Sequence, residues 1–174
     1  MIIRVAEQRD LDGIVSLAEE WELKDPNAGE SEDTVQGFLV SGYSKEDYKA
    51  FLESGAVLLV AAANGSGELA GFLLAGDPTL FRWSAYLQAS LSREDFESVL
   101  VIKQICAKRM QVRRSLGSSF YRYLSDTFPG RVLAAAIVLE PPNTASIRFH
   151  EKLGFVKMLE FSEDGIKKGL WIRR

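Results

Sequence analysis

Small and cationic residues come together in the stretch IKQICAKRMQVRRSLGSSFYRYL, which spans 102–124. An apolar run leads through a basic segment into a helix whose first turn is expected to hold four small residues, Ser115, Gly117, Ser118 and Ser119. Small side chains let an anion approach the backbone, and a helix N-terminus offers it unpaired N–H groups and the positive end of a dipole. Arg113 and Arg114, directly before this turn, carry guanidinium forks suited to phosphate oxygens. The stretch fits a phosphate-binding loop, and it fits a solvated basic loop before an ordinary helix equally well.

The stretch EPPNTASIRFHEKLGF (140–155) gathers polar side chains at the start and on one face of a second helix. Asn143 precedes the helix, where its side chain either caps the first turn or donates to a ligand. Ser146 and His150 are four residues apart, so they lie on the same helical face. His150 is the only histidine in the chain, and a lone helical histidine is more often a packed or surface residue than a catalyst. The pattern by itself leaves both roles open.

Taken together, the two stretches resemble the GCN5-related N-acetyltransferase (GNAT) superfamily. The family's pyrophosphate loop reads Gln/Arg-x-x-Gly-x-Gly/Ala, and the equivalent six residues here are 112–117, VRRSLG. The family's later helix reads Asn-x-x-Ala-x-x-Phe-Tyr-x-x-x-Gly-Phe, and its counterparts here are Asn143, Ser146, Phe149, His150, Gly154 and Phe155. The order of the predicted strands and helices is also that of the family, so the resemblance covers nearly the whole chain.

Three positions depart from the family pattern. Val112 replaces the usual Gln or Arg, and Ser115 replaces the first glycine. Serine is still small, but its range of φ is narrower than that of glycine. Because the loop offers backbone groups to the ligand, we expect cofactor binding to survive both changes. His150 stands where the family commonly has the tyrosine that is assigned to protonate the departing CoA thiolate.

The resemblance implies that acetyl-CoA, without a metal ion, lies in a V-shaped gap between the strands at 99–107 and 131–139. Backbone groups near Ile105, Cys106 and Ala107 would bond the pantetheine as an added strand does, and a backbone N–H there would stabilise the thioester oxyanion. The implied cofactor contacts continue along the loop and the later helix: Arg113, Arg114, Ser115, Leu116, Gly117, Ser118, Asn143, Ser146 and Phe149. A neutral amine would attack the thioester directly.

Such a transfer needs an acid for the sulfur and a base for the incoming ammonium. Imidazolium donates readily to a thiolate, but with an unperturbed pKa of about 6.5 a histidine is mostly neutral above about pH 7. His150 is the predicted acid, with a purely structural role as the alternative. Glu140, at the end of the strand 131–140, is the best candidate base and Glu97 the second; a water chain or an already neutral amine would need neither. Cys106 has no histidine near it in sequence and lies in an apolar strand, which disfavours a role as nucleophile.

The rest of the chain supplies the elements that position these groups. Hydrophobic patterning predicts strands at 2–6, 56–63, 68–77, 99–107, 131–140, 155–161 and 169–174, with turns at 64–67 and 163–165. It predicts helices at 10–21, from Ser44, at 114–127 and at 144–153, with Gly154 as a left-handed stop. The fold class is α+β with α/β/α layers: a mixed, mostly antiparallel twisted sheet of about seven strands, to which the resemblance adds a central splayed strand pair. The aromatic-rich segment 78–98 is either a connection packed on the core or a flap whose Trp83 and Tyr86 contact the substrate.

Composition limits the classes of protein open to this chain. Its 174 residues, 47% hydrophobic and 26% charged, are typical of one folded domain with a real core. A net charge of −3 gives no basic field for nucleic acid, and no apolar run is long enough for a signal peptide or a membrane helix. The single cysteine forms no internal disulfide, which suits a reducing compartment. We therefore expect a cytoplasmic protein, with homodimerisation left open.

The sequence thus predicts one acyl-CoA-dependent N-acyltransferase domain over 1–174, which moves an acetyl group from acetyl-CoA to a primary amine. The alternative is a catalytically weak acyl-CoA-binding or regulatory module of the same fold. The missing tyrosine and the lack of an obvious base favour this alternative. Neither hypothesis identifies the amine acceptor.

Overall fold

One seven-stranded sheet organises the computed structural model, which describes residues 1–23, 37–40, 42–62, 68–81, 84–108 and 115–174. Its strand order is β1-β2-β3-β4-β5-β7-β6. The strands are β1 (Ile2–Val5), β2 (Val57–Ala62), β3 (Leu69–Gly76), β4 (Leu100–Ala107), β5 (Leu133–Val138), β6 (Val156–Glu163) and β7 (Ile166–Arg173). Neighbouring strands are antiparallel except β4 and β5, which run parallel. The predicted mixed, mostly antiparallel sheet is confirmed.

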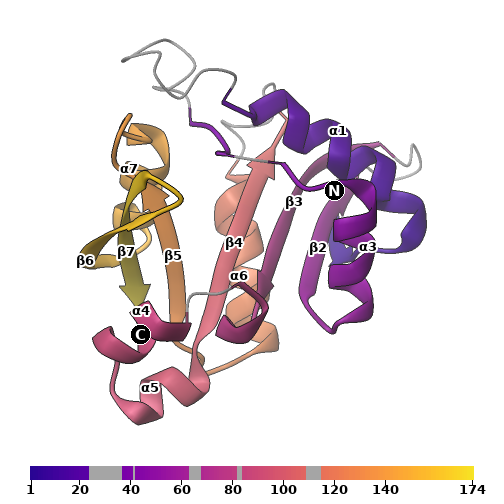
Figure 1. Ribbon diagram of the computed structural model, residues 1–174. Coiled ribbons are helices and arrows are strands. Elements are labelled where there is room, and N and C mark those ends of the chain that lie inside the picture. The colour runs from indigo at the N-terminus through magenta and orange to yellow at the C-terminus, as the bar shows by residue number, and fades with distance from the viewer. Residues whose placement is uncertain (24–36, 41, 63–67, 82–83, 109–114) are drawn as a thin grey trace.

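The two parallel strands separate along their length. β4 pairs with β5 only between Leu100–Ile102 and Leu133–Ala135, although β4 continues to Ala107 and β5 to Val138. Beyond this short contact each strand keeps only its outer neighbour, β3 or β7. Figure 1 shows the two halves of the sheet diverging from the point of contact. The predicted splayed pair is present, and it leaves one edge of β4 without a strand partner.

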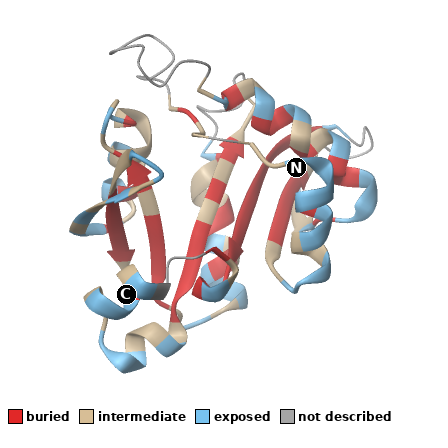
Figure 2. Cartoon of the chain, viewed as in Figure 1, coloured by how far each residue is buried: buried red, intermediate tan, exposed pale blue. Residues whose placement is uncertain are grey.

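Helices cover both faces of the sheet. On one face α1 (Leu11–Trp21) and α3 (Lys45–Glu53) bury apolar side chains against β2, β3 and β4. On the other face α6 (Leu116–Thr127) packs with β4 and β5, and α7 (Thr144–Lys152) adds partly buried side chains to the same cluster. The buried residues of α1 recur at helical spacing: Leu11, Ile14, Leu17, Ala18 and Trp21. Figure 2 shows buried residues filling the central strands between these helices.

Local signals in the sequence place several boundaries. Ser44 caps α3 and forms a capping box with Asp47. Gly154, with a φ of +86°, ends α7 in the left-handed conformation predicted for it. The turn between β6 and β7 is made by Asp164 and Gly165, whose φ angles of +52° and +78° fit a tight hairpin. β7 begins at Ile166, three residues before the strand expected from the sequence, because the hairpin continues the pairing up to the turn.

Residues 78–98 contain more helix than the sequence analysis anticipated. They form a 3₁₀ turn, η2 (Pro78–Phe81), and two short helices, α4 (Ser84–Ser90) and α5 (Arg93–Ser98); a further 3₁₀ turn, η1 (Gln8–Asp10), precedes α1. Their mixed aromatic pattern hid the helical period because each helix is two turns or less. The predicted turn at 64–67 lies outside the described residues. Among the helices that are described, none is long and apolar enough to cross a membrane.

Candidate active site

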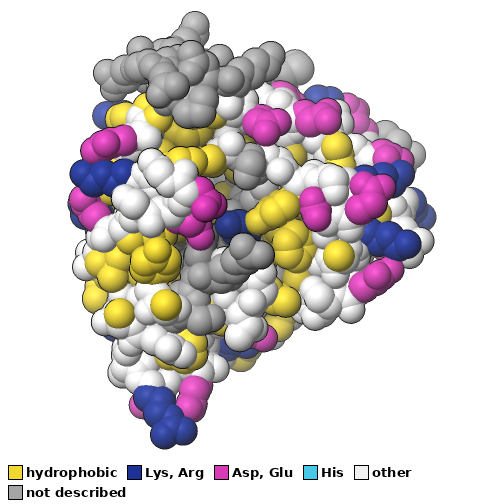
Figure 3. Space-filling view, in the orientation of Figure 1, with side chains coloured by type: hydrophobic (Ala, Val, Ile, Leu, Met, Phe, Trp, Pro, Cys, Tyr) yellow, Lys and Arg dark blue, Asp and Glu magenta, His cyan; other side chains and the backbone are white. Residues whose placement is uncertain are grey.

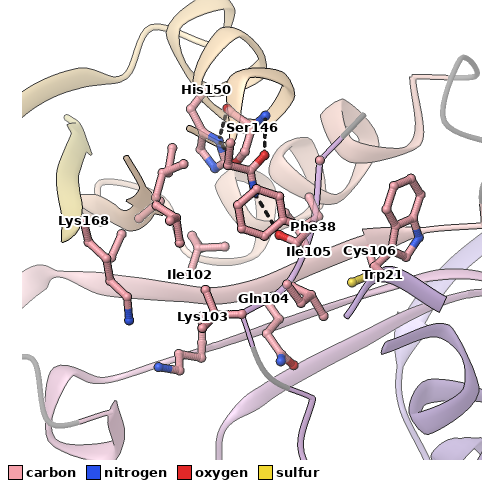
Figure 4. A pocket seen from close by; sticks show the side chains of 18 of the residues that line it. Trp21, Phe38, Ile102, Lys103, Gln104, Ile105, Cys106, Ser146, His150 and Lys168 are labelled. Carbon is pink, nitrogen blue, oxygen red and sulfur yellow. Dashed lines mark hydrogen bonds between the residues drawn. The ribbon is translucent and has the colours of Figure 1, made fainter. Parts of the chain in front are cut away.

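A cavity of about 680 Å³ opens where β4 and β5 separate. Its floor includes residues of both strands, Ile102–Ala107 and Ala135–Val138. α7 forms one wall, and the segment 37–40 forms another. Figure 4 shows His150 and Ser146 on one side of β4, with Lys103 and Gln104 on the other. The volume lies within the range usual for small-molecule sites.

Backbone groups of β4 face the gap. The Lys108 N–H donates to the Ala70 carbonyl of β3 at 2.8 Å. Because hydrogen-bonded and non-hydrogen-bonded pairs alternate in an antiparallel ladder, the peptide groups of Ile105 and Ala107 point away from β3, toward β5. The Trp21 indole Nε1–H donates to the Ala107 carbonyl at 2.8 Å and so occupies one of these groups. On the gap-facing edge of β4, the Ala107 carbonyl thus bonds to Trp21 of α1, and the backbone groups of Ile105 point toward the space that a ligand can enter.

The residue before α6 adopts the left-handed backbone conformation that glycine favours, although this residue is a serine. Ser115, where the family pattern has its first glycine, adopts a φ of +57°. Gly117 packs so tightly on α7 that an added Cβ would lie 2.6 Å from Cζ of Phe149. Gly117 lines the cavity, whereas the Leu116 side chain is buried in the core. Of the loop residues expected to bind the cofactor, Arg113 and Arg114 lie outside the described part of the chain.

Asn143 connects α7 to the segment that covers the cavity. Its Oδ1 accepts the Ser146 N–H at 3.2 Å, which caps the helix. Its Nδ2 donates to the Phe38 carbonyl at 2.8 Å. The side chain is 5% exposed and lines the cavity. Of the two roles considered from the sequence, capping is present, and one of the two Nδ2 hydrogens is used within the chain.

His150 lies in the cavity wall as a neutral imidazole. Its Nδ1 is 2.7 Å from the Ser146 carbonyl oxygen, so Nδ1 carries the proton and donates it there. Its Nε2 is 2.7 Å from the Tyr121 hydroxyl, which must therefore donate to Nε2. The ring is 2% exposed and packs edge-on against Phe149 and Phe155. Burial lowers the pKa of His150 to about 4, and the hydrogen bond to Ser146 only partly offsets this.

These contacts work against the predicted role of His150 as the general acid. At neutral pH both ring nitrogens are engaged and the imidazolium is scarce. The general-acid role of His150 stays a prediction, and the structural alternative gains support from these contacts. The aromatic neighbours and the desolvation they cause are not visible in the spacing of the motif.

The two carboxylates predicted as bases lie away from the cavity. Glu140 is 69% exposed and pairs with Lys167 at 3.0 Å. Glu97 is 62% exposed and pairs with Arg93. Neither is among the residues that line the cavity, so their roles stay predictions without a supporting contact. Glu163, from the end of β6, does line the cavity and pairs with Lys168 of β7 at 2.6 Å.

Segment 78–98 divides between the two roles considered for it. Leu80 and Phe81 line the cavity, as a substrate-contacting segment would. Tyr86 instead braces the hairpin: its ring stacks on Phe161 at 4.3 Å, and its hydroxyl donates to the Ser162 carbonyl at 3.2 Å. Trp83 lies outside the described residues.

Several cavity residues were not singled out from the sequence. They are Trp21, Tyr43, Phe51, Lys103, Glu163 and Lys168. Lys103 did leave a signal, because it is the one charged residue in the largely apolar run 99–107. The others come from elements distant in sequence that ordinary amphipathic patterns describe equally well.

Comparison with known proteins agrees with this geometry. The model of the acetyltransferase (GNAT) family matches residues 16–155, which include both motifs and the splayed strands. The chain belongs to this family. No curated protein matches the sequence.

Solved structures share the fold over nearly the whole chain. The protein yncA of Salmonella typhimurium, described as an acetyltransferase and determined with its cofactor acetyl-CoA, is 21% identical with a TM-score of 0.66 over 100% of this chain and 93% of that one. The ribosomal-protein-alanine N-acetyltransferase of Brucella melitensis is 18% identical with a TM-score of 0.63, covering 99% of each chain. The protein smu.2055 of Streptococcus mutans is 15% identical with a TM-score of 0.68 over 99% and 98% of the two chains. At these identities the likeness concerns the fold.

Proposed function

We propose that this protein is an acyl-CoA-dependent N-acyltransferase that moves an acetyl group from acetyl-CoA to a primary amine. The observation that carries the proposal is the separation of β4 from β5 beyond Ile102, which opens a cavity along β4 in a chain of the acetyltransferase family. A structural neighbour determined with acetyl-CoA supports the choice of donor. When bound, acetyl-CoA supplies an activated thioester whose C–S bond breaks as the amine nitrogen bonds to the carbonyl carbon.

The residues present fit this donor. Ile105 and Ala107, on either side of Cys106, direct backbone groups toward the open gap, where a pantetheine amide can bond as an added strand does. The N-terminal turn of α6, Ser115–Ser118, offers N–H groups to the pyrophosphate. Close contact between Gly117 and Phe149 keeps this turn beside the cavity. Arg113 and Arg114 are proposed to add charge to the same anion site.

The chain's own groups have defined tasks in the transfer. A gap-facing N–H of β4 stabilises negative charge on the thioester oxygen. Ser146 and Asn143 hold the start of α7 against the cavity. The acceptor's proton leaves to water or to a cavity carboxylate, for which Glu163 is better placed than Glu140. In this scheme the departing thiolate takes its proton from water, because His150 is held neutral at pH 7. A general-acid role of His150 is the alternative, which the pH profile of kcat tests.

Two measurements on the full chain test the proposal. CoA at concentrations above its Kd should raise the melting temperature, because it binds the folded state only. Acetyl-CoA with a panel of primary amines should release a free thiol that a chromogenic disulfide detects. Absence of a thermal shift at millimolar CoA would refute the donor assignment. Gly117→Glu should abolish the shift through steric clash and repulsion.

The weak acyl-CoA-binding module is kept as the second candidate because of the His150 environment. A neutral, fully hydrogen-bonded imidazole is a poor acid at pH 7. This candidate predicts a thermal shift with CoA but no thiol release with any amine.

A further inference from the structure

A cluster of three charged side chains borders the cavity on the side of β4 opposite His150. Glu163 and Lys168 form an ion pair of 2.6 Å across the β6–β7 hairpin, with side chains only 20% and 11% exposed. Lys103 lies in β4 at an irregularity of the sheet: Leu74 and Ala75 of β3 pair with Gln104 and Ile102, so the register shifts by one residue at Lys103. Figure 4 shows the Lys103 and Lys168 side chains extending to the same side of β4. All three residues line the cavity.

The charges of this cluster act on one another. Burial lowers the pKa of Lys103, Glu163 raises it, Lys168 lowers it further, and Asp164, which also lines the cavity, raises it. Glu163 also acts on the segment before α3, because burial, followed by the charge of Glu163, raises the pKa of Tyr43 to about 12. Residues from β4, the β6–β7 hairpin and the segment before α3 therefore converge on one small region. Figure 3 shows cationic, acidic and hydrophobic side chains meeting near the centre of this face.

An apolar wall stands beside the charges. The Tyr43 and Phe51 rings contact each other with centroids 5.0 Å apart, and Phe51 contacts Phe81 at 5.7 Å. Leu80 extends the wall, and all four side chains line the same cavity. The wall fits an aliphatic or aromatic body of modest size, held by burial and by edge-to-face ring contacts.

We infer that this region binds an acceptor that carries a carboxylate beside its primary amine on an apolar body, as a hydrophobic amino acid does. Glu163 receives the ammonium, Lys103 and Lys168 receive the carboxylate, and Tyr43, Phe51 and Phe81 contact the body. The inference rests on the proposed function, because it concerns the acceptor of that transfer.

Charge complementarity decides for a zwitterion over a simple amine. A desolvated cation is costly unless an opposite charge compensates it. The cavity lining here carries charges of both signs, with Lys103 and Lys168 on one side of the balance and Glu163 and Asp164 on the other. An acidic side chain can compensate a simple ammonium, but such a ligand offers nothing to the lysines, whereas an amino acid also brings a carboxylate for them. An acceptor that lacks the carboxylate should therefore bind more weakly than the loss of so small a group would suggest.

The test compares matched acceptors on the full-length protein. Thiol release from acetyl-CoA is measured with the twenty amino acids, and leucine and phenylalanine are each compared with their amide and with their decarboxylated amine. We expect kcat/KM for the better of the two amino acids to exceed that for its decarboxylated amine by about tenfold or more. Lys103→Met should remove most of this preference by lowering the value for the amino acid alone, while Lys103→Arg should retain it. Lys167→Met is the matched control, because Lys167 pairs with Glu140 outside the cavity.

Calorimetry separates failure of this inference from failure of the proposed function. Leucine and phenylalanine are titrated into the CoA-loaded wild type and into Lys103→Met, whose CoA affinity and unfolding midpoint show that it folds. Thiol release that is equal for amino acid and decarboxylated amine, and equally affected by Lys103→Met, overturns the inference and leaves the acyltransferase intact. Binding of the amino acid that depends on Lys103 without thiol release leaves the acceptor site standing and overturns the acyltransfer. No binding and no release with any amino acid overturns the inference.

Discussion

Protonation of His150 is expected to destabilise the folded protein. The folded chain holds the imidazole neutral with a pKa of about 4, against about 6.5 for an unperturbed histidine. The cause is burial, which the hydrogen bond from Nδ1 to the Ser146 carbonyl offsets only in part. Because the unfolded chain takes up this proton at higher pH than the folded one, acid favours unfolding.

The size and the pH window follow from the two pKa values. The stabilisation is fully present above about pH 6.5 and is lost as the pH falls toward 4, where the folded state also takes up the proton. The difference between pKa values of 6.5 and about 4, at about 1.4 kcal/mol for each pH unit, amounts to about 3–4 kcal/mol. This is a large share of the stability of a domain of this size.

His150 is the only histidine, which makes the assay direct. Urea unfolding of wild type and of His150→Gln is measured between pH 4 and pH 7.5, and the difference between the two proteins isolates this group from the carboxylates. The imidazole NMR signal reports the pKa of the folded state independently. A signal that titrates near 6.5, together with parallel stability curves for the two proteins, would refute the assignment.

The same pKa bears on catalysis. At pH 7 a group with a pKa of about 4 is protonated in about one molecule in a thousand. If this imidazolium were the required acid, kcat would rise about tenfold for each unit of falling pH between 8 and 5. We expect no such rise. A steep rise, or a loss of about 10²–10⁴ in kcat for His150→Phe that His150→Tyr restores, would return the general-acid role to His150.

Ser115→Gly is expected to stabilise the protein by about 1 kcal/mol, because glycine adopts a φ of +57° without the cost to serine. Ser118→Gly, inside α6, should instead lose a similar amount, and urea midpoints that shift in the same direction would contradict the strain argument. Gly117→Ala should cost about 1–3 kcal/mol and weaken CoA binding, because the new Cβ meets Phe149. Adding Phe149→Leu should recover part of both losses in calorimetry, whereas additive losses would argue against the close contact. Asp10→Asn should cost about 1–3 kcal/mol, because the buried carboxylate accepts two hydrogen bonds from one guanidinium. That guanidinium lowers the pKa of Asp10, so the advantage of wild type is present above about pH 4 and shrinks below it; a constant difference down to pH 2 would contradict this.

Local patterns in the sequence predicted most of the framework. The helical spacing of apolar residues in α1, the capping box at Ser44 and the stop at Gly154 each depend on a few neighbouring residues. For the same reason the two motifs led to the acetyltransferase family, which a match over residues 16–155 then showed. The short helices α4 and α5 were not predicted, because in two turns or less the apolar residues do not repeat often enough to show the helical period.

The roles of individual site residues depended on contacts between distant segments. Glu140 follows a central strand in sequence, yet its side chain turns to Lys167 at the surface. His150 matches the motif, but Tyr121 and Phe155 set its protonation, and no spacing rule reports a pKa.

The sequence by itself predicted the family and the order of the strands and longer helices along the chain, because these follow from local periodicity and from motifs read within about fifteen residues. Only the tertiary structure brought Lys103 of β4 beside Glu163 and Lys168 of the last hairpin. Sixty residues separate Lys103 from Glu163 in the chain. Their approach depends on how far β4 and β5 separate and on the register of β6 with β7. Charge interaction and desolvation act through space, so the charges that gather in this part of the cavity were decided by the packing.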